Sequence, residues 1–156
     1  MRLLALGLGL LLTAAPAIAC VCIEPATPEQ KREIAARIAD QAVAVVDVEL
    51  AEPMDQRSMR GEKYRVLAVH WGNAPALFEL ERGFSRGSGG EVQIVMTPCD
   101  VVPPSGERTT VVLFATSSPH RFRIGGTCDH LFVNTGDAIE LIRKEARKLA
   151  PSTERG

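Results

Sequence analysis

The sequence has few aromatic residues and no excess of either charge. One Trp, one Tyr and five Phe are its only aromatic residues, too few rings for a surface on which nucleic-acid bases stack. Its 18 Lys and Arg residues are balanced by 19 Asp and Glu residues. Proteins that bind nucleic acids usually carry a basic patch, so we expect no nucleic-acid partner.

Long apolar runs are also missing. A membrane-spanning helix needs about 20 apolar residues, and the run from Leu3 to Leu12 is shorter than that. Preceded by Arg2 and followed by small residues at Ala17 and Ala19, this run has the three parts of a secretory signal peptide. We therefore predict that residues 1–19 are removed on export to the periplasm or the medium. No transmembrane segment is expected in the mature chain.

Cleavage after Ala19 would make Cys20 the first residue of the mature protein. A Cys that follows small residues can also be a lipoprotein site, and an acyl chain would then attach Cys20 to a membrane. Two observations disfavour this alternative: Ala17 stands where such sites usually have Leu, and lipidation would leave an odd number of thiols. The expected terminus is therefore a free Cys20 amine, with lipidation as the second possibility.

The mature chain is predicted to be one mainly β domain, residues 20–150, with a disordered tail at 151–156. Thr27-Pro28-Glu29-Gln30 has the form of a capping box with Pro at the first helical position, which predicts a helix to about Asp40. A second helix is predicted from Asp137 to Leu149. Because strands follow one another without intervening helices, we expect a small antiparallel barrel with these flanking helices. The expected strands are 42–51, 63–71, 76–81, 91–97, 109–116 and 121–124, with a last strand region at 128–133 and a glycine-rich loop at 83–90.

Four Cys residues, at 20, 22, 99 and 128, lie in the mature part. An even number in an exported chain predicts two disulfides, for which three connectivities exist. A bond between Cys20 and Cys22 would close a very small, strained ring. The other two connectivities both tie the terminus to two distant points, and the spacing does not choose between them. A redox-active pair at Cys20 and Cys22 is the remaining alternative, and it would need reactive thiols.

The mature chain has, in order, the processed Cys20-Val21-Cys22 start, a short helix, a Val-rich strand, a strand that ends in Val69-His70-Trp71-Gly72, and single Cys residues at 99 and 128. In the order of these features it resembles the bacterial netrin-like domains. These are similar to the N-terminal domain of the tissue inhibitors of metalloproteinases (TIMPs). The resemblance implies a five-stranded, antiparallel OB-type Greek-key barrel with flanking N-terminal and C-terminal helices. It also implies the disulfides Cys20–Cys99 and Cys22–Cys128.

The resemblance further implies a function for the terminus. In the family, the α-amine and carbonyl oxygen of the first Cys chelate the catalytic zinc of a target protease, and the second residue enters the adjacent specificity pocket. These roles would fall on Cys20 and Val21, next to Cys22, and the partner would be a zinc metalloprotease. The alternative is a structural or protein-interaction module of the cell envelope, with no protease inhibition, in which the disulfides serve stability alone.

Catalytic motifs are absent from the sequence. His70, His120 and His130 match no zinc-ligand spacing, and Asp129-His130 has no nucleophile placed with it by a motif. We therefore expect neither an enzyme nor a cofactor, and no metal ion of the protein's own. Trp71, at the end of its strand, is expected to close the barrel core.

Overall fold

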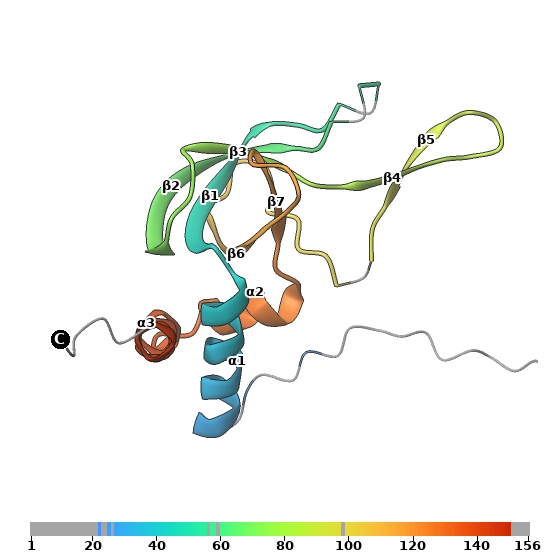
Figure 1. The fold of residues 1–156 in the computed structure, drawn as a ribbon. Helices are drawn as coiled ribbons and strands as arrows, with labels where there is room; N and C mark the ends of the chain where they lie inside the picture. Colours follow the sequence, from blue (N-terminus) through green and yellow to red (C-terminus); the bar gives the residue numbers. More distant parts are fainter. Residues whose placement is uncertain are drawn as a thin grey trace, which may run out of the picture.

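The computed structural model describes residues 22, 25, 27–55, 57–58, 60–97 and 99–150. The predicted signal peptide, Cys20, Val21 and the tail at 151–156 lie outside the described residues. Five strands form a closed barrel in the order β1-β2-β3-β7-β6 (Figure 1). The strands are β1 (Ala44–Glu52), β2 (Lys63–Gly72), β3 (Leu77–Leu80), β6 (Thr109–Ala115) and β7 (Arg121–Ile124).

The barrel is a mixed sheet. β1 pairs antiparallel with β2 and β6, and β2–β3 and β6–β7 are antiparallel as well. β3 and β7 are parallel, with Glu79 opposite Arg121 and Leu80 opposite Phe122. The expected all-antiparallel barrel is therefore wrong at this one pair, which closes the barrel between segments far apart in the sequence.

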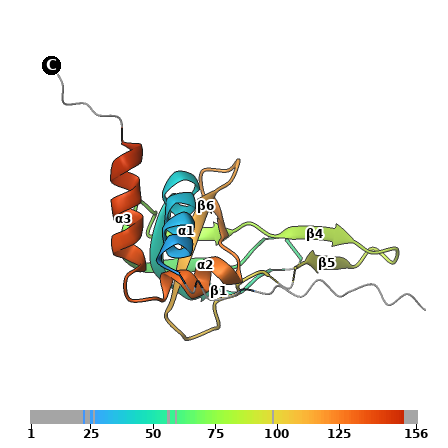
Figure 2. The same cartoon turned by 90° about the horizontal axis from the view of Figure 1, so that it is seen from below.

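A two-stranded hairpin stands outside the barrel. It consists of β4 (Gly83–Arg86) and β5 (Val92–Val95), and Phe84 lies opposite Ile94 in its register. Both views show it reaching away from the barrel and the helices (Figures 1 and 2). The prediction of a loop over 83–90 is thus wrong for 83–86, where cross-strand pairing overrides the low strand preference of glycine and serine.

Three helices gather at one side of the barrel (Figures 1 and 2). They are α1 (Pro28–Gln41), α2 (Thr127–Val133) and α3 (Ala138–Leu149). The capping box predicted at the start of α1 is confirmed: Thr27 Oγ1 accepts from the Gln30 amide, and the Gln30 side chain accepts from the Thr27 amide. The strand predicted at 128–133 is wrong, because these residues form α2.

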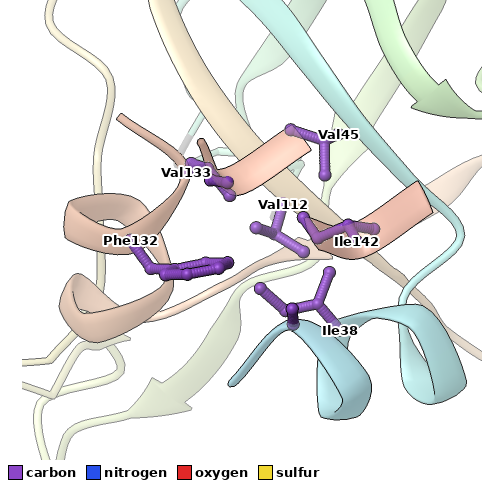
Figure 3. Packing of buried hydrophobic residues seen from close by; sticks show 8 residues of the cluster. Ile38, Val45, Val112, Phe132, Val133 and Ile142 are labelled. Atoms are coloured by element: carbon purple, nitrogen blue, oxygen red, sulfur yellow. The ribbon is translucent and has the colours of Figure 1, made fainter. Parts of the chain in front are cut away.

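Two groups of buried residues make up the core. One lies between the helices and the outer side of β1 and β6, and Figure 3 shows Ile38, Phe132 and Ile142 meeting Val45 and Val112 there. The other fills the barrel, with the Tyr64 and Phe78 rings stacked at 5.8 Å. Trp71 packs half-buried against the first group, beneath the helices, and so does not close the barrel interior as expected.

Candidate partner-binding site at the half-cystines

A disulfide joins the start of the described chain to α2. Cys22 and Cys128 are bonded, with an S–S distance of 2.08 Å and Cα atoms 5.1 Å apart. This is one of the two pairs that the resemblance implies. Cys128 is the second residue of α2 and is exposed, so the bond attaches Cys22 to the surface of that helix.

Cys99 lies against the same helix. The Thr127 amide and the Thr127 hydroxyl both donate to the Cys99 carbonyl oxygen, at 3.0 and 3.2 Å. The turn that carries Cys99 is closed by Asp100, whose Oδ2 accepts from the Thr97 amide at 2.7 Å. Cys99 is itself disulfide-bonded, and Cys20, the partner that the resemblance implies, lies outside the described residues. Cys99 and Cys128 are therefore close neighbours at the first turn of α2.

Two side-chain contacts fix α2 in place. Arg37 on α1 forms an ion pair with Asp129, whose side chain is only 10% exposed. His130 Nδ1 lies 3.0 Å from the Thr110 carbonyl oxygen on β6. Asp129 and His130 thus hold α2 to α1 and to the barrel, and His130 also contacts Asn134 at the end of α2.

The structure leaves the proposed reactive terminus undescribed, since Cys20 and Val21 lie outside the described residues. Of the three His residues, His70 faces Asp47, His130 faces the Thr110 carbonyl oxygen, and the His120 carbonyl oxygen accepts from the Glu79 amide. Among the described residues, no group of three or more His, Cys, Asp or Glu side chains is arranged to hold a metal ion. No helix in the described part of the chain is long and apolar enough to cross a membrane.

The sequence did not predict that a carboxylate on β1 is buried. Asp47 lies between Val46 and Val48 on β1, and its charged side chain is only 5% exposed. Thr110 Oγ1 donates to it at 2.6 Å, Arg108 Nε at 2.7 Å, and His70 Nε2 lies 3.0 Å away. Burial raises the pKa of Asp47, but the hydrogen bonds from Thr110, Arg108 and His70 outweigh it, so the pKa lies below its ordinary value.

A polar cavity next to the half-cystines was also missed. It has a volume of about 470 Å³ and lies where the ends of β3 and β7 meet α1, α2 and the base of the hairpin. Three guanidinium groups line it, those of Arg37, Arg82 and Arg123, together with carboxylates. Tertiary pairing of β3 with β7 assembles this lining, and no local sequence pattern signals it.

No family model, curated protein or solved structure matches the chain.

Proposed function

We propose that this chain is an exported, disulfide-stapled, TIMP-like binding protein that inhibits a zinc metalloprotease through its processed terminus. The α-amine and carbonyl oxygen of Cys20 would chelate the zinc ion of the target, and Val21 would fill the adjacent specificity pocket. The zinc belongs to the partner protease. The site of action is the periplasm or the medium, as the signal-peptide pattern of residues 1–19 suggests.

The position of Cys99 beside Cys128 carries this proposal. Thr127, the residue before Cys128, donates two hydrogen bonds to the Cys99 carbonyl oxygen, so the two half-cystines lie close together. Cys20 and Cys22 are two residues apart in sequence, so a single short segment can reach both. Bonds Cys22–Cys128 and Cys20–Cys99 would then hold the first three residues of the mature chain in a fixed position, whereas chain ends normally fray.

The barrel gives further support. A closed five-stranded barrel with helices at one side agrees with the OB-type fold that the resemblance implies. The exposed residues Val95 and Met96 directly precede the turn that carries Cys99, so a partner bound beside this turn would find apolar surface there. Fold alone does not assign the function, which therefore depends on the terminus.

The chemistry requires a free terminus. An α-amine has a pKa of about 7.7–8.0, so it loses its proton at little cost near neutral pH and can then bind zinc. Chelation by the amine and carbonyl would displace the zinc-bound water that the protease uses as its nucleophile. A preceding residue would turn the amine into an amide, and an acyl chain would do the same.

The experiment compares three forms of the exported protein against a panel of zinc proteases. Intact mass first establishes whether the mature chain starts at Cys20 with a free amine. A form with one Ala before Cys20 should lose inhibition by more than about 100-fold, because a zinc ligand is removed. A form with one Ala added after Gly156 is the matched control and should inhibit like the natural chain.

A second function is favoured by the exposed position of the Cys22–Cys128 disulfide on α2. Such a bond can act as a staple alone, in a structural or interaction module of the cell envelope. That function predicts no inhibition by a protein whose Cys20 amine is verified as free. It also predicts that an Ala placed before Cys20 leaves partner binding unchanged.

A further inference from the structure

Two charged side chains are buried at the wall of the polar cavity. The Arg82 side chain is 6% exposed, and its Nε and Nη2 donate to the Glu62 carboxylate at 3.0 and 3.2 Å. Asp129 is held in the same way by Arg37 from α1. Taking ion pairs out of water is unfavourable unless other contacts compensate for the lost hydration. These two ion pairs therefore fix Arg82 and Asp129 in the cavity wall.

A second pair of charges, Glu81 and Arg123, lies at the cavity. Leu80 lies opposite Phe122 in the parallel pairing, and the Glu81 amide donates to the Phe122 carbonyl oxygen at 2.9 Å. Glu81 and Arg123 are therefore neighbours on the outer side of the barrel, and both are exposed. Within the described part of the chain, the Arg123 guanidinium contacts the Phe114 ring, 6.0 Å from its centroid, and neither residue forms an ion pair.

The mixture of charges selects the ligand class. Carboxylates of Glu81, Asp100 and Asp129 line the cavity with the three Arg residues, so a simple anion or a simple cation would meet repulsion. A molecule with one positive and one negative charge could pair with both the carboxylates and the guanidinium groups of the lining. The volume of about 470 Å³ lies within the range of small-molecule sites.

We propose that this cavity binds a short peptide with both ends free, such as a dipeptide. Its carboxylate pairs with Arg123, with the fixed guanidinium of Arg82 behind it, and its ammonium group pairs with Glu81. Phe114 and Val95, also in the lining, contact its apolar side chains. This binding does not depend on protease inhibition.

The test is a titration of the isotope-labelled full chain with four forms of L-alanyl-L-alanine, followed through the backbone amides of Gly125 and Gly126. The four forms are free, N-acetylated, C-amidated and blocked at both ends. We expect the free dipeptide to bind about tenfold more tightly than either singly blocked form, since each block removes a charge-assisted contact. Equal binding of the doubly blocked form, or no response to any form, would overturn the proposal.

Variants then assign the two ends. With Arg123→Gln, the free and C-amidated dipeptides should bind equally weakly, and with Glu81→Gln the free and N-acetylated forms should do so. Arg121→Gln is the matched control, because Arg121 lies on the same strand but pairs with Glu79 outside the cavity lining. Both test positions are exposed, so the fold should persist. If Arg123→Gln binds the dipeptide as Arg121→Gln does, the assignment is wrong.

Discussion

Loss of the Cys22–Cys128 disulfide should destabilise the domain by an amount set by chain entropy. The two residues are 106 apart in sequence, and a loop of that size corresponds to about 4.8 kcal/mol in the unfolded chain. A second bond, Cys20–Cys99, would shorten the effective loop to about 30 residues and reduce the value to about 3.7 kcal/mol. Cys128 is exposed, so its replacement leaves no buried cavity to add to this figure.

The double variant Cys22→Ala with Cys128→Ala isolates this effect. We expect its free energy of unfolding in urea to fall by about 4 kcal/mol, with a decrease in Tm of roughly 10 to 20 °C. Non-reducing intact mass must first show that the natural chain holds its disulfides. A loss of less than about 1 kcal/mol in a variant that still folds would refute the chain-entropy account of this bond.

Two further predictions concern buried polar groups in the barrel. Asp47→Asn should lower the free energy of unfolding by about 2 kcal/mol at pH 7, because hydrogen bonds to a charged group are lost. The folded-state pKa of Asp47 is depressed, so its stabilisation is present above its ordinary value of 3.8 and fades as pH falls below it. The free energies of unfolding of the natural chain and the variant, measured in urea, should therefore converge as the pH falls to 3. A difference between them that stays constant with pH would contradict this. Tyr64→Phe should stabilise the domain by about 1 kcal/mol at pH 7, since the buried Tyr64 hydroxyl has no hydrogen-bond partner among the described residues. Burial, helped by the Glu62 charge, raises the pKa of Tyr64 to about 12, so the natural chain alone should lose stability through this residue as pH rises from 10. Equal stability of both proteins at pH 7 would show that the hydroxyl is satisfied.

Local signals in the sequence predicted much of the secondary structure. The start of α1 follows from its Thr27 cap and Pro28, which act within one helical turn. The strand predicted at 63–71 is present as β2, and burial alternates along it, with Tyr64 buried and Arg65 exposed. Short-range capping and alternation need no knowledge of the rest of the fold.

Features that depend on distant residues were not predicted. The N-cap of α2 is Gly126, which has no side chain to cap the helix, and the seven residues of α2 are too few to display a helical period. The parallel pairing of β3 with β7 has no local signature either. The burial of Asp47 and the cavity between Arg82 and Arg123 both follow from such long-range pairing, because strands from distant parts of the chain supply their partners.

The measurement that tests the proposed function most directly is inhibition of zinc proteases by the chain with a verified free Cys20 amine, compared with the same chain extended by one Ala before Cys20. Inhibition by the first form, with a loss of more than about 100-fold in the second, is the result that zinc chelation by the terminus predicts. Equal inhibition by both forms, or no inhibition by the form with the verified free amine, would contradict zinc chelation. The disulfides would then serve stability alone, in a structural or interaction module of the cell envelope.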